Sequence, residues 1–436
     1  MTRLTGLKLS TSPLLRSGHA LALSIVAGGC LIGQAAILSR HPLAFQLPDS
    51  PSYISLGSLL LAHPSLSNLF DAYRTPGYPV ALAVIGGVQG QVAGDGVVFV
   101  QAGLMVLTAF ELYVLTFGLT GSSIAAGLAG FIFATNVRLL DWERLIMTEA
   151  LAIFLVATTV LAFWQWMRHR RRVWAVGFTA ASILAVLTRP SLIYLPICLV
   201  LLLVAGDRKR WLPAALLGAA IYAPLLGYGI VNDRLHPHAG LSAISNINLL
   251  GKVLEYRMQG EGDPGRFPTL WQGITNLPKG DADPYHILQA NPQSMGPDYW
   301  DAYRFSQDIV LSHPIEYVEK SAGDLVQEWL AVPYAYIPPG DLRWVSQALA
   351  DYSLVAYAAY PALLLVIAAL LVMWRRLDRQ VALGIGALLL TVAGTLVTTA
   401  LFSYVDFARL RTPVDGLAFV AVIAMSAQLL KRVGRA

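Results

Sequence analysis

Long apolar runs, separated by short polar segments, occupy most of the chain. A helix that crosses a bilayer needs about 20 mostly apolar residues. The pattern therefore predicts an all-α polytopic membrane protein with about ten transmembrane helices. The predicted spans are His19–Leu38, Val97–Leu119, Gly121–Val137, Glu149–Met167, Val173–Leu187, Ser191–Ala205, Trp211–Ile230, Tyr352–Trp374, Val381–Phe402 and Pro413–Leu430.

The spacing of these runs divides the chain into three segments. Residues 1–230 are expected to form an N-terminal transmembrane module, residues 231–351 a loop domain on the outer side, and residues 352–436 a C-terminal transmembrane bundle. The loop domain is rich in Pro, Gly, Asp and Asn, which favour turns. It also contains apolar positions at helical spacing, from Ile247 to Met258 and from Ile315 to Leu330. These helices are expected either on the membrane surface or against the loop domain itself.

The placement of basic residues predicts the orientation of the chain. Cytoplasmic loops of membrane proteins carry an excess of Lys and Arg. If the short run Pro76–Gly90 stays at the surface, 16 of the 31 Lys and Arg residues fall in cytoplasmic loops, and both termini are cytoplasmic. These basic residues are Arg3, Lys8, Arg16, Arg168, Arg170, Arg171, Arg172, Arg208, Lys209, Arg210, Arg375, Arg376, Arg379, Lys431, Arg432 and Arg435.

The composition agrees with a membrane protein and excludes other classes. Hydrophobic residues make up 56% of the chain and charged residues 13%, whereas a soluble protein carries about 25% charged residues. A disordered, fibrous or soluble chain is therefore excluded. The formal net charge of +5 reflects the basic cytoplasmic loops, so we expect no nucleic-acid partner. The two cysteines lie in apolar runs and are read as buried thiols, not as a metal site or a disulfide.

The loop after the first span contains the first candidate for catalysis. Asp49 follows that span by about eleven residues and precedes two short apolar stretches, Tyr53–Ala62 and Leu66–Tyr73, which are typical of helices on the outer leaflet. The segment Arg74–Pro79 (RTPGYP) then breaks the helix. An alternative role for Asp49 is to cap the helix that follows it.

A second acidic residue lies at the next outer loop. Glu149 opens a predicted span from the outer side. The topology therefore places Asp49 and Glu149 at the same depth, at the outer membrane boundary, although about a hundred residues separate them. Ionisable groups at such a boundary are costly unless they are paired or functional. The alternative is that Glu149 simply begins a helix.

Arginines share this outer face with the two acids. Arginine matches the geometry of phosphate oxygens, and a carboxylate can act as a general base towards a hydroxyl. Together they suit the transfer of a group from a lipid phosphate to a hydroxyl acceptor at the bilayer surface. The arginines expected on this face are Arg74, Arg144, Arg189, Arg409 and Arg411, of which Arg144 is the most readily explained by pairing with Asp141 or Glu143.

In order and sidedness, these motifs resemble the integral-membrane C-type (GT-C) glycosyltransferases, such as the lipid A aminoarabinose transferases and the protein O-mannosyltransferases. The matching features are Asp49 in a long first outer loop, the basic-Pro-Gly-Tyr segment Arg74–Tyr78, Glu149 at the mouth of a later span, and the hairpin sequence Thr188–Ser191 (TRPS). The resemblance covers about residues 1–210. It departs at Glu149, where aspartate is common, and at Arg74, where some members carry Lys.

The resemblance implies an enzyme of the bacterial inner membrane with an extracytoplasmic active site. Its donor is expected to be a polyprenyl-phosphate sugar, and its acceptor a hydroxyl of an envelope lipid, glycan or protein, with inversion at the anomeric carbon. Asp49 is the expected base, with Glu149 orienting a substrate or sharing that role. Donor phosphate is expected to bind Arg74 and Arg189, with Arg409 and Arg411 as further candidates. No cofactor is implied, and a divalent cation is possible but has no support in the sequence.

A transporter or lipid-sugar flippase is the alternative from another functional class. Secondary transporters show internal repeats and charges near the membrane midplane. This chain shows no repeat, and Glu111 is an acid in the interior of a predicted span. Glu111 lies about 21 Å below the outer end at 1.5 Å per residue. It is therefore expected to make an interhelical hydrogen bond or to be protonated, away from Asp49.

Overall fold

The computed structural model describes residues 13–40, 43–335, 343–404 and 407–433, and their regular structure is helical. Phe45 and Leu145 form an isolated parallel bridge. The predicted all-α fold is confirmed. The helices are α1 (Pro13–Arg40), α2 (Ser50–Ala62), α3 (Gly77–Gln89), α4 (Gly96–Thr120), α5 (Ser123–Ala134), α6 (Val137–Leu140), α7 (Glu149–His169), α8 (Arg172–Thr188), α9 (Tyr194–Gly206), α10 (Trp211–Leu235), α11 (Ile244–Glu255), α12 (Pro268–Thr275), α13 (Pro284–Ala290), α14 (Trp300–Ser312), α15 (Pro314–Leu330), α16 (Arg343–Tyr357), α17 (Ala359–Met373), α18 (Arg379–Phe402) and α19 (Phe407–Val433).

Within the described residues, seven helices are long and apolar enough to cross a membrane, or eight if one bent pair forms a single span. The predicted count of ten is therefore not confirmed. Two of the ten predicted spans correspond to the shorter helices α8 and α9, which are separated at Pro190. Proline cannot continue a helix through its missing N–H, so the apolar run breaks into a hairpin. The predicted span Gly121–Val137 ends at Ala134 and then bends by 49°.

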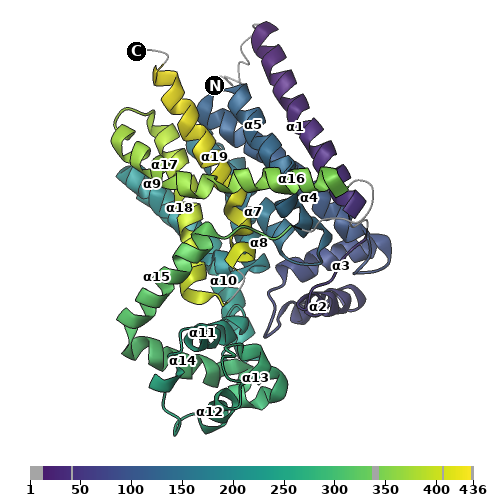
Figure 1. Cartoon of the computed structure of the whole chain (residues 1–436), viewed down its shortest axis with the longest axis vertical. Coiled ribbons are helices and arrows are strands. Elements are labelled where there is room, and N and C mark those ends of the chain that lie inside the picture. The colour runs from purple at the N-terminus through teal and green to yellow at the C-terminus, as the bar shows by residue number, and fades with distance from the viewer. Residues whose placement is uncertain (1–12, 41–42, 336–342, 405–406, 434–436) are drawn as a thin grey trace.

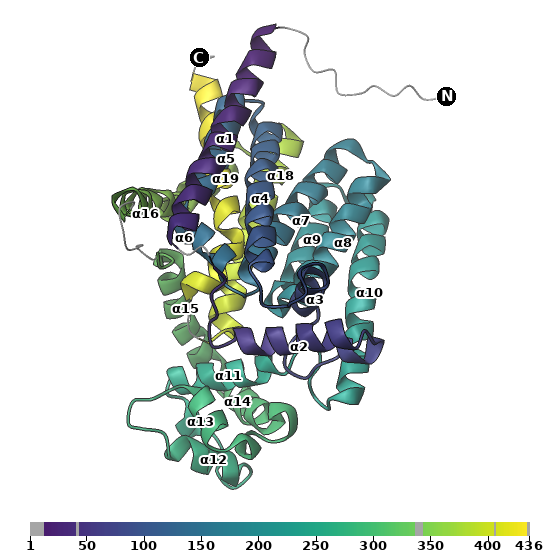
Figure 2. The same cartoon turned by 90° about the vertical axis from the view of Figure 1, so that its right-hand side faces the viewer.

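The transmembrane helices form a bundle with α7 at its centre (Figure 1). Most of the apolar window of α7 is buried, and this helix packs against α4, α8 and α19. The start of α1 and the end of α19 lie at one end of the bundle, and α11–α14 lie at the other (Figures 1 and 2). We call the end next to α11–α14 the site end.

Helices α11–α15 form a unit at the site end with a core of its own. The predicted helical pattern Ile247–Met258 is present as α11, and its apolar face is buried within this unit. The pattern therefore serves internal packing, one of its two expected roles. The second pattern lies on α15, where Ile315 and Val318 are exposed. Leu325 and Trp329 of the same helix pack against the core of the bundle.

Two of the three short elements predicted in the first outer loop are α-helices. The stretch Tyr53–Ala62 lies within α2, and the short apolar run Pro76–Gly90 contains α3. Helix α2 lies across the site end of the bundle (Figure 2). The stretch Leu66–Tyr73 contains only a 3₁₀ turn, Leu66–Leu69. The loop therefore covers the end of the bundle and returns to it at α3.

Candidate active site

A short backbone pairing brings together the segment that follows α1 and the segment that precedes α7. The amide of Phe45 donates to the carbonyl of Arg144 (2.8 Å), and the amide of Ile146 donates to the carbonyl of Phe45 (3.0 Å). Asp49 lies four residues after Phe45 in the first segment, and Glu149 lies three residues after Ile146 in the second. The pairing therefore places both carboxylates at the same end of the bundle, as their predicted depth required.

Gln101 of α4 holds the second loop in position. Its side-chain amide donates to the carbonyls of Glu143 and Leu145, both at 2.8 Å. The hydroxyl of Tyr78 donates to the side-chain oxygen Oε1 of Gln101 at 2.9 Å. All the polar atoms in this chain of bonds are buried, so each bond spares a group that would otherwise be unsatisfied. Tyr78 of the RTPGYP segment thus orients the loop that leads to Glu149.

Three arginines and two carboxylates form one continuous ion-pair network. Arg74 Nη2 donates to Asp49 Oδ1 (2.9 Å), and Arg409 Nη2 donates to Asp49 Oδ2 (3.3 Å). Arg409 Nε also donates to Glu149 Oε1 (2.6 Å). Arg189 Nη1 lies 3.8 Å from the same Glu149 oxygen. The structure therefore brings together five of the six predicted site residues, with Arg409 as the bridge between the acids.

Asp49 has a side-chain environment that keeps it ionised. It occupies the N-cap position of α2, yet its side chain makes no capping hydrogen bond. Burial raises the pKa of Asp49, but the charges of Arg74 and Arg409 outweigh that effect and hold the pKa below its ordinary 3.8. Its side chain is 37% exposed. Asp49 is thus an ionised, accessible carboxylate.

Aromatic rings and a hydroxyl fix the guanidinium of Arg74. The group lies over the rings of Tyr53 (4.3 Å) and Tyr73 (4.6 Å). Its Nε donates to Ser52 Oγ at 2.9 Å, and its Nη1 donates to the Tyr53 hydroxyl at 3.1 Å. Cation–π contact and hydrogen bonding together hold a planar guanidinium in one orientation. Arg74 is therefore placed before any substrate binds.

Glu149 is fully buried in the first turn of α7. A helix N-terminus favours an anion, and Arg409 and Arg189 supply the opposite charge. Glu149 is not among the described residues that line the neighbouring cavity, whereas both of these arginines are. Its carboxylate therefore contacts the two arginines without lining the cavity, and it orients them.

Gly77 allows the RTPGYP segment to approach the Thr188–Ser191 hairpin. A Cβ at this position would lie 2.6 Å from both the Leu187 carbonyl oxygen and Thr188 Oγ1. Real side chains do not come this close, so only glycine fits without a backbone shift. The contact sets the distance between the segments that carry Arg74 and Arg189.

Replacing Gly77 by Ala is expected to displace Arg74 from Arg189 and to lower the activity of the site roughly tenfold or more, because small displacements of positioned groups are costly. The matched control is Gly87→Ala on the same helix, where a Cβ meets only Leu61 at an ordinary 3.6 Å. Turnover and thermal stability of both variants are the measurements. Equal turnover in the two variants would show that the close approach does not position the arginines.

A cavity of about 1110 Å³ opens beside the ion-pair network. Its charged end holds Asp49, Arg74, Arg189 and Arg409, together with Tyr53, Thr148 and Thr188. Another part of its lining comes from α11, α14 and the start of α13. The volume is in the range of small-molecule sites. One cavity therefore contains both a cluster of arginines that could bind a phosphate and additional polar lining.

Arg411 does not reach this cavity, which corrects its prediction as a phosphate-binding residue. It is fully buried and donates from Nε to Asp415 Oδ1 at 3.0 Å. Its other nitrogens donate to the carbonyls of Glu328, Trp329 and Ala331, and its guanidinium lies 3.7 Å from the Tyr360 ring centroid. These contacts join α15 to α19, so the role of Arg411 is structural.

Two other candidates also lie away from the network. Arg144 is buried and pairs with Glu143 at 3.3 Å, in keeping with one of its two predicted partners. Glu111 accepts a hydrogen bond of 2.7 Å from Thr158 Oγ1 on the neighbouring α7. This is the interhelical bond that was one of its expected roles. Neither residue lines the cavity.

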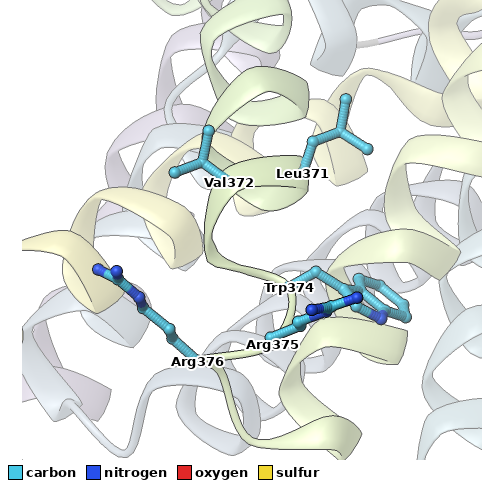
Figure 3. A pocket seen from close by; sticks show the side chains of 5 residues that line it. All are labelled: Leu371, Val372, Trp374, Arg375 and Arg376. Carbon is cyan, nitrogen blue, oxygen red and sulfur yellow. The ribbon is translucent and has the colours of Figure 1, made fainter.

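A second hollow lies far from the acids. It has a volume of about 680 Å³ and is lined by Leu371, Val372, Trp374, Arg375 and Arg376 at the end of α17 (Figure 3). No carboxylate stands among these residues, so the hollow offers no base. The described residues also contain no group of three His, Cys, Asp or Glu side chains that is suited to a metal.

Sequence reasoning missed the tyrosines around the network. Tyr53 and Tyr73 hold Arg74, and Tyr285, Tyr303 and Tyr404 line the cavity. Tyr53 and Tyr73 precede Arg74 in a loop whose apolar pattern suggested only membrane contact. Tyr285 and Tyr303 come from the unit formed by α11–α15, where no motif marks them.

The charged end of the cavity comes largely from a segment that also matches a known family. Residues 50–210 match the model of the dolichyl-phosphate-mannose-protein mannosyltransferase family. This confirms the resemblance to C-type glycosyltransferases over that segment. It includes Arg74, Glu149 and Arg189, and it begins one residue after Asp49. A comparison with curated protein sequences found no match.

Solved structures of two C-type enzymes are also similar to the chain. The oligosaccharyltransferase AglB from Archaeoglobus fulgidus has 16% identity and a TM-score of 0.49, and the match covers 95% of this chain and 51% of that one. ArnT from Cupriavidus metallidurans has 15% identity and a TM-score of 0.39, with 89% and 78% covered. The chain thus spans about half the length of the archaeal enzyme.

Proposed function

We propose that this protein transfers a sugar from a polyprenyl-phosphate donor to a hydroxyl of a cell-envelope acceptor. The observation that carries the proposal is the network of Asp49, Arg74, Arg189 and Arg409 at one end of a single cavity. An arginine cluster suits a lipid phosphate, and an accessible carboxylate suits a hydroxyl nucleophile. The match of residues 50–210 to a family that uses a dolichyl-phosphate sugar supports the same chemistry.

The charge of the network fits a phosphodiester donor. The described contacts of the network join three guanidinium groups to two carboxylates, an excess of one positive charge. A polyprenyl-phosphate sugar carries one negative charge, which this surplus neutralises. When the bond to the sugar breaks, a second negative charge develops on the phosphate. Guanidinium groups held in place before the reaction stabilise that charge most in the transition state.

Asp49 is the proposed general base. It lines the cavity, is partly exposed and is ionised, whereas Glu149 is fully buried and lies outside the cavity lining. Asp49 accepts the proton as the acceptor hydroxyl attacks the anomeric carbon, and the phosphate leaves with the electrons of the broken bond. A single displacement inverts the anomeric carbon. Glu149 acts as a positioning residue for Arg409 and Arg189.

The site end of the bundle is proposed to face the extracytoplasmic side of a bacterial inner membrane, with both termini in the cytoplasm. The distribution of basic residues supports this orientation, because the loops with the most Lys and Arg lie at the other end. Accessibility of single cysteines at positions 171 and 272 to a membrane-impermeant thiol reagent, in intact cells, is the test. Labelling of position 171 but not 272 would reverse the orientation.

The transfer reaction itself is tested with synthetic polyprenyl-phosphate sugars and the reconstituted protein. Acceptor-dependent release of polyprenyl phosphate is the expected result, and Arg74→Ala is expected to raise the KM for the donor about tenfold or more, because a charge-assisted contact to phosphate is lost. Arg257→Ala is the control, since Arg257 lies outside the cavity lining. A donor KM that Arg74→Ala leaves unchanged would remove Arg74 from phosphate binding.

The pH profile tests the protonation state of Asp49. Because the pKa of Asp49 lies below 3.8, its carboxylate stays ionised as pH falls, and kcat is expected to drop only below pH 3.8. Arg74→Met removes one of the charges that lower this pKa. With saturating donor, its acid limb is expected at a higher pH than that of the wild type. Superimposable acid limbs of kcat in wild type and Arg74→Met would contradict the assignment of Asp49 as base.

A further inference from the structure

The part of the cavity lining that comes from α11, α13 and α14 has a distinct chemistry. We call it the outer wall and define it by its polar and aromatic cavity-lining side chains from α11, α14, and α13 with its N-cap Asp283. They are Asn246, Asn248, Asp283, Tyr285, Tyr303 and Gln307. We propose that the outer wall binds the acceptor of the transfer reaction and that this acceptor is an uncharged carbohydrate. The inference rests on the proposed function, because it assigns the donor phosphate to the arginines.

The charge of the outer wall disfavours an anionic acceptor. Among the lining residues between positions 238 and 317 there is no Lys or Arg, and Asp283 is an acid. Burial raises the pKa of Tyr404, which also lines the cavity, and the negative charge of Asp283 raises it further. The field of Asp283 therefore reaches into the cavity. A phosphorylated or acidic acceptor would meet this field without a counter-charge on the wall.

Two basic side chains contact the outer wall without lining the cavity: Arg304, and His286, whose Nε2 lies 4.0 Å from Asp283 Oδ2. Arg304 Nη1 donates to Gln307 Oε1 at 3.4 Å, and its guanidinium lies 6.0 Å from the Trp300 ring centroid. Arg304 is not among the described residues that line the cavity. Under the proposed function, the arginines of the charged end bind the donor phosphate. An anionic acceptor would thus compete with the donor for the same groups.

The polar groups of the outer wall match sugar hydroxyls, which both donate and accept hydrogen bonds. Asn248 Oδ1 accepts a long bond of 3.4 Å from the Tyr285 hydroxyl, which leaves its NH₂ group available to a ligand. The Gln307 amide nitrogen and the Tyr303 hydroxyl make no hydrogen bond to the described residues. The tyrosine rings supply apolar surface beside these groups. Aromatic walls with a few placed polar groups are typical of sites that orient a small polar ligand.

The same unit offers little to a peptide acceptor. Two common modes of peptide binding are the addition of a strand to an exposed sheet edge and the placement of a helix in an apolar groove. The described residues of α11–α15 and their connections form helices and turns, without a strand edge. The side of the cavity they provide is also lined by amide and phenol groups. These features favour a carbohydrate over a Ser- or Thr-containing peptide.

Binding measured in the absence of turnover tests the acceptor class. The full-length protein is placed in lipid nanodiscs with polyprenyl phosphate, so that the arginines are occupied. Calorimetry then compares a neutral trisaccharide, the same trisaccharide with a terminal phosphate, and a hexapeptide with Ser and Thr. We expect the neutral trisaccharide to bind about tenfold more tightly than either of the others. Tighter binding of the phosphorylated sugar or of the peptide would overturn the inference, as would no binding of the neutral sugar.

A matched pair of variants locates the binding. Gln307→Ala removes a wall amide and is expected to weaken binding of the neutral trisaccharide about tenfold, because a paired hydrogen bond is lost. Gln272→Ala makes the same change at an exposed position of α12 outside the cavity. It is expected to leave binding unchanged. Gln307→Lys adds a cation and is expected to shift the preference towards the phosphorylated sugar. Equal binding by all three variants would exclude the outer wall.

Turnover separates this inference from the proposed function. Acceptor-dependent release of polyprenyl phosphate with the phosphorylated sugar or the peptide as the better acceptor would keep sugar transfer and overturn the neutral acceptor. Binding of the neutral trisaccharide without any release would contradict sugar transfer and retain a carbohydrate site on the outer wall.

Discussion

Replacing Asp49 by Asn is expected to lower kcat for sugar transfer by about 10²- to 10⁴-fold, the usual contribution of a general base. The amide keeps the shape of the carboxylate but cannot take the proton from the acceptor hydroxyl. It also loses the ion pairs with Arg74 and Arg409. Those arginines remain in the cavity, so the donor KM is expected to change far less than kcat. Initial rates of polyprenyl-phosphate release, at saturating donor and acceptor, measure the effect.

Asp95→Asn is the matched control for this substitution. Asp95 immediately precedes α4, at the end of the segment that joins α1 to α4, is exposed and lies outside the cavity lining. Its replacement is expected to leave kcat within about twofold of wild type, as for most surface changes. If Asp49→Asn retains the same kcat as Asp95→Asn, Asp49 is not the base. A loss confined to the donor KM would instead assign Asp49 to the orientation of the arginines.

The convergence of Asp49 and Glu149 could be predicted from the sequence because membrane topology fixes depth. Asp49 follows one apolar run and Glu149 begins another. Because the length of each run is set by the bilayer thickness, the ends of the two runs lie at the same depth. The bridge of Phe45 to the 144–146 segment then supplies the lateral contact, which no sequence pattern marked. The sequence also left open whether Asp49 caps α2. The structure shows its side chain directed to arginines, without a capping bond.

Helical spacing alone could not predict which of Arg409 and Arg411 faces the cavity. Successive residues of a helix are rotated by about 100°, so two residues apart point to nearly opposite faces. Both were expected as phosphate-binding candidates, although this spacing allows at most one of them to reach the site. The spacing did not identify which one, because the rotation of α19 is set by its packing against α7, α17 and α18. In the structure Arg409 faces the cavity and Arg411 faces α15.

Replacing Arg411 by Ala is expected to lower the free energy of unfolding by roughly 3–5 kcal/mol, the usual cost of breaking a buried pair. Asp415 would keep a buried charge without its cation, and the carbonyls of α15 would lose their donor. Donor KM in the folded fraction is expected to stay near the wild-type value, since Arg411 does not line the cavity. Chemical unfolding in nanodiscs and donor titration provide the two measurements.

Arg375→Ala serves as the control, because Arg375 is exposed at the end of α17. It is expected to leave stability unchanged within about 0.5 kcal/mol. The double variant Arg411→Ala/Asp415→Ala is expected to lose less stability than the sum of its single variants, since neither buried charge is then left alone. Additive losses would show that the pair is not coupled. A raised donor KM with unchanged stability would return Arg411 to phosphate binding.

The outer wall was beyond prediction for a different reason. Its residues come from α11, α13 and α14, whose mutual placement depends on the packing of a separate apolar core. Helical spacing identified the apolar face of α11 from Ile247 to Met258, but the polar residues between those positions carried no motif. Asn248 and Tyr285 meet only after the unit has folded. The charged end of the cavity could therefore be predicted from the sequence, and the outer wall could not.

The most direct test of sugar transfer is a stereochemical assay with the reconstituted protein and a polyprenyl-phosphate sugar of defined anomeric configuration. NMR of the glycosylated acceptor reports the configuration of the product, and extraction reports the lipid released. Base catalysis by Asp49 in a single displacement predicts one polyprenyl phosphate released per sugar transferred, with the anomeric carbon inverted. Retention of configuration, or transfer from a nucleotide sugar without any release of polyprenyl phosphate, would contradict it.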